Sequence, residues 1–250
     1  MEISLILPAF NEAASIERTL KEAASYFAAR GYEYELIVAA DGEDGTRECA
    51  RELASTNLRI KVIGERIRLG KGRGIREGVS LATGRIIGFA DADNKVPIDE
   101  YDKIAPWLEG GYHVVIGSRA LSKSRIERAQ PLYRRLGAKG FGFLMHTVVG
   151  LPDIPDTQCG FKFFRGDVAR DLFRRQRVDG YMFDVEILAI ARGLGHTIQQ
   201  VPVRWRDDAD SRLELFRGNV QNVVDLLKIR WSLGRLAKSP LEALADAVKG

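Results

Sequence analysis

The sequence predicts one α/β domain with a mostly parallel, doubly wound central sheet flanked by helices. Short apolar runs alternate with segments of helical periodicity. The runs also lack the strict polar alternation of strands that have one solvated face, which is typical of strands buried on both sides. The chain has 250 residues, 45% of them hydrophobic, and is long enough to bury one sizeable core. We therefore expect the chemistry to lie where the strands end.

The predicted strands of the regular part are rich in Ile, Val and Leu and span residues 4–10, 35–40, 60–64, 85–90 and 114–117. The predicted helices between them have apolar residues every three or four positions and span residues 13–29, 45–54, 72–82 and 98–108. Beyond residue 119 the order is a helix at 131–149, a strand at 160–164, helices at 166–175 and 184–194, a strand at 198–205 and a helix at 213–233. We assign residues 1–235 to the domain and 236–250 to a C-terminal tail.

The charge pattern permits anionic partners without selecting one. The net charge is +4, with 38 basic and 34 acidic residues, and cations concentrate between residues 123 and 139. A non-catalytic module that binds nucleic acid through this basic segment is the alternative from another class. We expect no nucleic-acid partner, because Tyr133 is the only aromatic residue in the segment.

The two cysteines, Cys49 and Cys159, form no CxxC pair, which favours a reducing compartment and argues against a zinc or redox site. We expect a cytoplasmic protein. No apolar stretch reaches the roughly 18 residues that span a bilayer, so the sequence predicts membrane contact from one face only. Residues 131–149 and 213–233 combine apolar helical spacing with basic neighbours. This pattern fits interfacial helices and, about equally well, helices packed on the core.

Polar residues follow three of the predicted strands. Phe10 ends the first strand, Glu12 follows it and Asp41 follows the second strand, on a rim where a nucleobase could stack and form hydrogen bonds. Taken alone, the glycines after Asp41 indicate only a turn. The sequence Gly70-Lys71-Gly72 begins the third predicted helix, where backbone N–H groups and one cation suit an anion. Its spacing is not that of a Walker ATPase.

Asp91-Ala92-Asp93 follows the most apolar strand. Two carboxylates one residue apart at a strand end repel each other unless a cation lies between them. Their hard oxygens suit Mg²⁺ or Mn²⁺, with phosphate and water completing the coordination shell. The alternative is a capping aspartate beside a solvated one.

Two further motifs lie beyond the regular part, at residues 156–162 and 183–186. Asp156 begins the first, which ends in Cys159-Gly160-Phe161-Lys162. Asp184 and Glu186 open a predicted helix, where acids also complement the helix dipole. We interpret Cys159 as a packing residue, because no base stands beside it in the sequence.

These motifs, in this order, resemble the family-2 glycosyltransferases of GT-A fold, whose single domain is Rossmann-like. Within them the sequence is similar to the polyprenyl and dolichyl phosphate glucosyltransferases and their mannosyl relatives. The residues that carry the resemblance are 8–12, 41–46, 70–72, 91–93, 117–119, 156–162, 183–186 and 211–213. The resemblance implies an inverting, metal-dependent transfer of a hexose from a nucleotide sugar, with UDP-glucose favoured, to a polyprenyl or dolichyl phosphate at a membrane surface.

The resemblance also implies roles for single residues. The nucleotide sugar would be bound by Pro8, Ala9, Phe10, Glu12, Asp41, Lys71, Asp91, Ala92, Arg206 and Arg212. Asp91 and Asp93 would bind Mg²⁺ or Mn²⁺, and Asp93, Gln158, Asp184 and Glu186 would serve catalysis beside the sugar. The acceptor phosphate would meet Arg119, Arg134 and Lys139.

Other donors and acceptors stay open at this point. The donor could be GDP-mannose or UDP-GlcNAc, and the acceptor could be soluble. Asn94-Lys95 stands where the mannosyl relatives often have Leu-Gln, which favours glucose over mannose. The resemblance is compatible with a homodimer.

Overall fold

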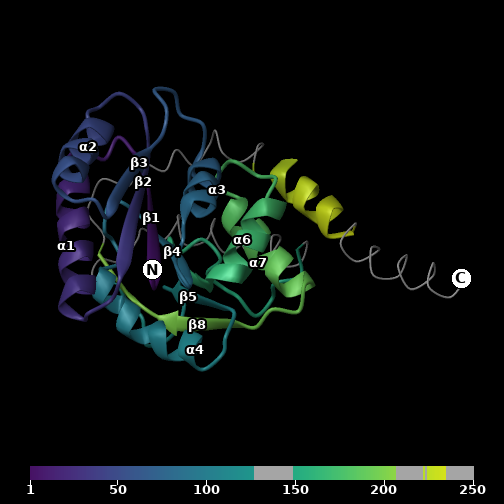
Figure 1. Ribbon diagram of the computed structural model, residues 1–250. Helices are drawn as coiled ribbons and strands as arrows, with labels where there is room; N and C mark the ends of the chain where they lie inside the picture. Colours follow the sequence, from purple (N-terminus) through teal and green to yellow (C-terminus); the bar gives the residue numbers. More distant parts are fainter. Residues whose placement is uncertain (127–148, 207–221, 223, 235–250) are drawn as a thin grey trace, which may run out of the picture.

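The main sheet of the described residues has seven strands in the order β3-β2-β1-β4-β7-β5-β8 (Figure 1). The structure is a computed structural model, and it describes residues 1–126, 149–206, 222 and 224–234. The strands are β1 (Ile3–Phe10), β2 (Tyr34–Asp41), β3 (Ile60–Ile63), β4 (Ile86–Ala90), β5 (Val114–Ser118), β6 (Arg125–Ile126), β7 (Phe161–Arg165), β8 (Ile198–Pro202) and β9 (Arg204–Trp205). The helices are α1 (Ile16–Ala29), α2 (Thr46–Thr56), α3 (Lys71–Leu81), the 3-10 helix η1 (Ile98–Lys103), α4 (Ala105–Glu109), α6 (Gly166–Arg175) and α7 (Phe183–Gly193).

The sheet topology brings the predicted motifs to one edge. Strands β1, β2, β3 and β4 run parallel, so the carboxyl ends of β1, β2 and β4 lie together. Strand β7 runs antiparallel between β4 and β5, with Ala90 opposite Phe161. The start of β7 therefore reaches the edge at which β4 ends. The residues around Gly160 consequently lie beside Asp91, although 69 positions of sequence separate the two.

Helices cover both faces of the sheet, as predicted for a doubly wound arrangement. Figure 1 shows α1 and α2 on one side of the sheet and α3, α6 and α7 on the other. Alternate residues of a strand feed the two cores, because successive side chains point to opposite faces. Leu5 and Leu7 join the core under α1, and Ile6 joins the core under α3 and α7. The prediction of a mostly parallel sheet flanked by helices is confirmed.

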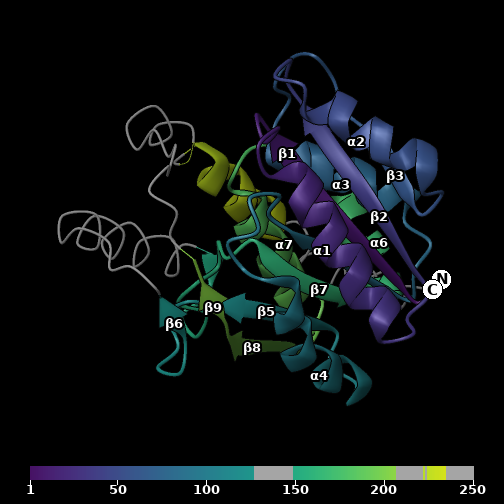
Figure 2. The ribbon, with the colours of Figure 1, turned by 90° about the vertical axis from the view of Figure 1, so that its left-hand side faces the viewer.

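Two predicted elements of the described chain are broken in the structure. The helix predicted at 98–108 is the 3-10 helix η1 followed by the short α4. Pro106, at the start of α4, lacks the N–H that a continuous helix would need and disfavours helical backbone before it. The strand predicted at 198–205 ends at Pro202, and β9 then pairs with β6 in a second, two-stranded sheet, seen beside β5 in Figure 2. The short β6 was not predicted.

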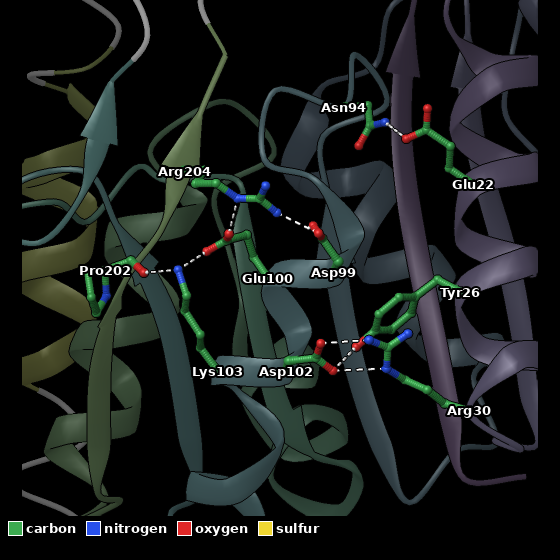
Figure 3. Close-up of polar contacts among 10 residues, drawn as sticks. All are labelled: Glu22, Tyr26, Arg30, Asn94, Asp99, Glu100, Asp102, Lys103, Pro202 and Arg204. Atoms are coloured by element: carbon green, nitrogen blue, oxygen red, sulfur yellow. Dashed lines mark hydrogen bonds and ion pairs between the residues drawn. The ribbon is translucent and has the colours of Figure 1, made fainter.

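The loop after β4 and the helix η1 are pinned on two sides. Two residues of α1 hold the loop. The Thr19 hydroxyl donates to the carbonyl of Ala92 (2.8 Å), and the Asn94 side-chain amide donates to Glu22 (2.5 Å). Asn94 has a positive φ of 56°, which asparagine tolerates better than most residues. Figure 3 shows the Asn94 contact with α1.

The other side of η1 is tied to β8 and β9 by charged hydrogen bonds. Arg204 donates to Asp99 and to Glu100 (both 2.5 Å), and Lys103 bridges Glu100 (2.5 Å) and the carbonyl of Pro202 (3.1 Å) (Figure 3). Asp102 on η1 accepts from Tyr26 and Arg30 of α1. The segment that carries Asp91 and Asp93 is thus held between α1 and residues 202–204, at the end of β8 and the start of β9.

Glu35 joins several segments at the edge of the sheet opposite Asp91 and Asp93. From its hydrogen bonds we expect the stability of the protein to depend on pH. Its buried carboxylate accepts from Ser4 (2.6 Å), Lys61 (2.6 Å) and Thr83 (2.8 Å from both the N–H and the hydroxyl). Burial alone would raise the pKa of Glu35, but these hydrogen bonds outweigh it and lower the pKa from 4.5 to about 2. A lowered folded-state pKa stabilises the fold above the unfolded value, and this contribution is lost as the pH falls from about 4.5 towards 2.

Glu35→Gln is therefore expected to lower the free energy of unfolding at pH 6 by on the order of 1–2 kcal/mol, since the half-exposed Lys61 is screened by solvent. Urea denaturation across pH 2.5 to 6 measures the effect. The difference between wild type and variant should shrink as the pH falls. A difference that is the same at pH 6 and pH 2.5 would contradict this assignment.

Candidate active site

The ends of β1 and β2 form one rim of the site. Phe10 pairs with Asp41 in the register of the two strands, and the guanidinium of Arg68 lies 4.4 Å from the centre of the Phe10 ring. Asp41 accepts the backbone N–H groups of Glu65 (3.1 Å) and Leu69 (2.8 Å), so its carboxylate holds the 65–69 loop against the strand end. A partly exposed aromatic ring under a cation is a surface on which a nucleobase can stack.

Asp91 and Asp93 lie at the end of β4, and each carboxylate has a lysine partner. Lys71 Nζ lies 2.5 Å from Asp91 Oδ1, and Lys95 Nζ lies 3.1 Å from Asp93 Oδ2. The pKa of Asp93 is raised, first by burial and then by the negative charge of Asp91. For Lys71, burial alone would lower the pKa, but the charges of Asp91 and Asp184 outweigh it and raise the pKa. The repulsion between carboxylates that the sequence predicted is thus present.

The two carboxylates are themselves suitable ligands for a divalent cation. Both side chains are partly exposed, at 38% for Asp91 and 29% for Asp93, so their oxygens can be reached from solvent. Gly160 lies directly beside Asp91, and a Cβ at this position would stand only 2.0 Å from Asp91 Oδ2. No third His, Cys, Asp or Glu completes a metal-binding group in the described chain. Two carboxylates that solvent can reach match the preferences of Mg²⁺ and Mn²⁺, which take one or two protein carboxylates and complete their shell with phosphate and water.

A buried ion pair lies next to this site. Lys162 of β7 pairs with Asp184 of α7, and the two side chains are 0% and 3% exposed. Lys162 Nζ also donates to the carbonyl of Cys159 (2.7 Å), which holds the turn before Gly160. Burial raises the pKa of Asp184, and the charges of Lys162 and Lys71 oppose this effect without cancelling it. Asp184 thus links the start of α7 to the turn that borders Asp91.

Glu186 and Gln158 have different surroundings. Glu186 is 1% exposed, and its carboxylate accepts the backbone N–H groups of Arg177 (2.9 and 3.0 Å) and Val178 (2.8 Å). It therefore holds the loop that precedes α7. The Gln158 amide lies 3.7 Å from the sulfur of Met182. The predicted catalytic roles of Glu186, Gln158 and Asp184 stay predictions.

Arg119, at the end of β5, forms the side of the site nearest to β7 and β9. Its backbone N–H and its Nε both donate to Asp156 Oδ2 (2.7 and 2.9 Å), and a terminal nitrogen donates to Oδ1 (2.8 Å). Burial alone would raise the pKa of Asp156, but Arg119 outweighs it and lowers the pKa. The guanidinium also lies 5.6 Å from the ring centre of Trp205, whose ring is 5.9 Å from Lys95 Nζ. Trp205 therefore connects the carboxylate pair with the predicted acceptor arginine.

Some of the predicted binding residues have buried side chains, have partners within the protein or lie outside the described residues. Ala9 and Ala92 are buried in the core under α1, and Pro8 is half-buried within β1. The Glu12 carboxylate accepts from Ser15 (2.8 Å) at the start of α1. The backbone N–H of Arg206 donates to the carbonyl of Lys95 (2.8 Å), which brings the 206 position next to the carboxylates. Arg134, Lys139 and Arg212, like residues 236–250, lie outside the described residues.

A cavity of about 300 Å³ lies away from these residues. It is lined by Arg85, Ile86, Leu108, Gly111, Arg165 and Asp167. Arg85 and Ile86 stand where β4 begins, so the cavity is at the opposite edge of the sheet from Asp91. It contains none of the predicted site residues.

Three residues of the site were given no role in it from the sequence. Arg68 stacks on Phe10, Lys95 pairs with Asp93, and Lys162 lies under the turn at Gly160. The signals were weak. Arg68 is one of several cations before Gly70, Lys95 is a single cation after the carboxylates, and Lys162 was part of a motif without a role of its own.

Residues 4–173 match the family described as Glycosyl transferase family 2, which is more than half of the chain. The chain belongs to this family. A dolichyl-phosphate beta-glucosyltransferase of Trichomonas vaginalis is 32% identical to this glycosyltransferase over 95% of the chain and 75% of the relative. The dolichyl-phosphate beta-glucosyltransferase of Drosophila melanogaster is 33% identical over 92% of the chain and 74% of the relative. The resemblance read from the motifs is thereby confirmed.

Solved structures support the fold. Glucosyl-3-phosphoglycerate synthase from Mycobacterium tuberculosis, crystallised with Mn²⁺ and UDP-glucose, superposes with a TM-score of 0.66 at 21% identity, over 92% of this chain and 78% of that one. Mannosyl-3-phosphoglycerate synthase from Rubrobacter xylanophilus gives a TM-score of 0.64 at 18% identity, over 98% and 75%. Among the described residues of this glycosyltransferase, no helix combines the length and the apolar character needed to cross a bilayer.

Proposed function

We propose that this glycosyltransferase transfers glucose from UDP-glucose to a polyprenyl or dolichyl phosphate, with inversion at the anomeric carbon. The observation that carries the proposal is the position of Asp91 and Asp93 between the Phe10 rim and Arg119, in a chain whose relatives are named dolichyl-phosphate beta-glucosyltransferases. In the proposed arrangement, a nucleotide, its diphosphate and an acceptor phosphate would lie side by side along this edge of the sheet.

The donor would lie with its base on the Phe10 rim and its diphosphate at the carboxylates. A divalent cation held by Asp91 and Asp93 would neutralise the charge that develops on the departing diphosphate. Lys71 and Lys95 supply two further positive charges within 3.1 Å of these carboxylates. Groups arranged in advance around a developing charge stabilise the transition state most, because they do not have to reorganise during the reaction.

The enzyme would position the acceptor phosphate and would not need a general base to activate it. A phosphate monoester has a second pKa near ~6 and is already largely dianionic at neutral pH, so it needs no strong base to become a nucleophile. Nε and one terminal nitrogen of Arg119 donate to Asp156, which fixes the guanidinium. The other terminal nitrogen of Arg119 would then be the one that meets a phosphate oxygen. The buried carboxylate of Asp184 pairs with Lys162, and that of Glu186 accepts backbone N–H groups. These contacts favour a role for both residues in holding the site in shape.

The lipid would be reached from a membrane surface. Residues 224–234 are helical and expose Val224, Leu227 and Trp231, with Lys228 close by, while Leu226 and Ile229 face the core. Apolar side chains beside a cation are typical of a helix that lies in the membrane interface. The free Cys49 and Cys159 fit a reducing compartment, so we place the enzyme on the cytoplasmic face.

The test combines purified protein, radiolabelled UDP-glucose, Mg²⁺ and a polyprenyl phosphate. We expect label to pass into the organic phase only when the lipid phosphate is present. Parallel reactions with GDP-mannose and UDP-GlcNAc identify the donor. Labelled product that stays in water with a soluble acceptor such as 3-phosphoglycerate would favour the soluble alternative, and no product with any donor or acceptor would refute the proposal.

A further inference from the structure

Each carboxylate of the Asp91 and Asp93 pair carries its own lysine. Lys71 Nζ is 2.5 Å from Asp91, and Lys95 Nζ is 3.1 Å from Asp93. The lysine side chains are only 18% and 17% exposed, so both ammonium groups lie within the site and are poorly solvated. Two negative and two positive charges leave the group electrically neutral. The ammonium groups therefore lie against the oxygens that a divalent cation would use.

The two lysines come from different elements whose backbones are held independently. Lys71 is the first residue of α3, and the carbonyl of Asp179 accepts the N–H of Gly72 beside it (2.8 Å). The Lys95 carbonyl accepts the N–H of Arg206 (2.8 Å), and its ammonium lies 5.9 Å from the ring centre of Trp205. A lysine has a flexible four-carbon stem. Its ammonium can therefore change partners while its backbone stays fixed.

A divalent cation alone meets an unfavourable site here. It would have to approach two carboxylates while two ammonium groups remain beside them, and like charges at such distances repel. A diphosphate alone finds two ammonium groups but also two carboxylates of its own sign. When both ligands bind together, neither repulsion remains. The cation binds the two carboxylates, and the phosphate oxygens bind the two ammonium groups.

We propose that Lys71 and Lys95 are exchangeable counter-ions that pass from Asp91 and Asp93 to the donor diphosphate when the divalent cation binds. The inference rests on the proposed function and adds Lys95, which no motif indicated, as a diphosphate-binding residue. The exchange makes the binding of metal and nucleotide strongly cooperative. Each ligand removes a repulsion that weakens binding of the other. The increase in affinity is therefore the same whichever ligand binds first.

Calorimetric titrations of the full chain test the exchange, with Mn²⁺ alone, UDP alone, and each in the presence of the other. For the wild type we expect each ligand to increase the affinity for the other by roughly 5–150-fold. UMP, which lacks the second phosphate, should couple more weakly. In Lys95→Met and Lys71→Met, Mn²⁺ alone should bind more tightly than to the wild type, and the coupling with UDP should fall at least about fivefold.

Control variants separate the exchange from general effects of charge and folding. Lys21→Met removes one positive charge from the exposed face of α1, where Lys21 pairs with Glu17, and should titrate like the wild type. Lys95→Arg keeps the charge and should keep most of the coupling. Lys95→Gln repeats the test if the methionine variant does not fold by circular dichroism.

The outcomes distinguish this inference from the proposed function. Wild-type protein that binds neither UDP nor Mn²⁺, alone or together, would refute both. Wild-type protein that binds them cooperatively, with Lys71 and Lys95 variants whose Mn²⁺ affinity and coupling equal those of Lys21→Met, would refute the exchange alone.

Discussion

Asp93→Ala is expected to reduce glucosyl transfer by at least about 10²–10³-fold without loss of stability. The variant removes one of the two carboxylates at the end of β4 that, in the proposed function, would hold a divalent cation and so stabilise the departing diphosphate. Stability should not fall, because ionised Asp93 is unfavourable in the fold. Its pKa is raised by burial and by the neighbouring charge of Asp91. Initial rates with UDP-glucose and a lipid phosphate measure the first effect, and urea denaturation measures the second.

Asp167→Ala is the matched control for this variant. Asp167 follows β7 at the edge of the sheet opposite the carboxylate pair, where it pairs with the exposed Arg165. Its loss should leave transfer within about twofold of the wild type, because a surface ion pair contributes little. An Asp93→Ala enzyme with wild-type turnover would remove Asp93 from the metal site and leave Asp91 without the partner that the motif implies.

Lys162→Met is expected to destabilise the protein by about 3–5 kcal/mol, which is the usual cost of removing one member of a buried ion pair. Asp184 would keep its carboxylate at 3% exposure with no opposite charge in contact, and the carbonyl of Cys159 would lose its donor. Urea denaturation at pH 7 gives the change in the free energy of unfolding. We expect a lower midpoint with the slope preserved.

The double variant Lys162→Met with Asp184→Leu is the control, because it removes both charges at once. Replacement of a buried pair by apolar side chains is often close to neutral, so the double variant should recover most of the lost stability. If the single variant is as stable as the wild type, the pair does not hold the start of α7 to the turn at Gly160, and another contact has to position that turn.

Much of the fold followed from periodicity. The runs at residues 4–10, 35–40 and 85–90 are apolar without alternation, and they form β1, β2 and β4 at the centre of the sheet, buried on both faces. The failures are local. Pro106 divides the helix predicted at 98–108, and Pro202 ends β8 before residue 205. In both places helical or strand-like spacing continued past a residue that lacks the backbone N–H the element requires.

The candidate site also contains residues that the sequence predicted and residues that it did not. The carboxylates after β4 and the aromatic residue at the end of β1 were predictable, because the ends of parallel strands converge on one edge. Lys95 and Arg68 carried no comparable signal, because a cation in a loop usually faces solvent. Their importance depends on what stands opposite, which is Asp93 for Lys95 and the Phe10 ring for Arg68.

The amino-acid sequence by itself determined the alternation of strands and helices, the membership of glycosyl transferase family 2, and the identity of the residues at the strand ends, since all three depend on local pattern. Only the tertiary structure decided the charge balance of the site. The antiparallel insertion of β7 beside β4 sets Gly160 against Asp91 and buries Lys162 with Asp184, and α3 delivers Lys71 to the same carboxylate. Electrostatic energy depends on separation in space and on burial, and neither quantity can be read from separation along the chain.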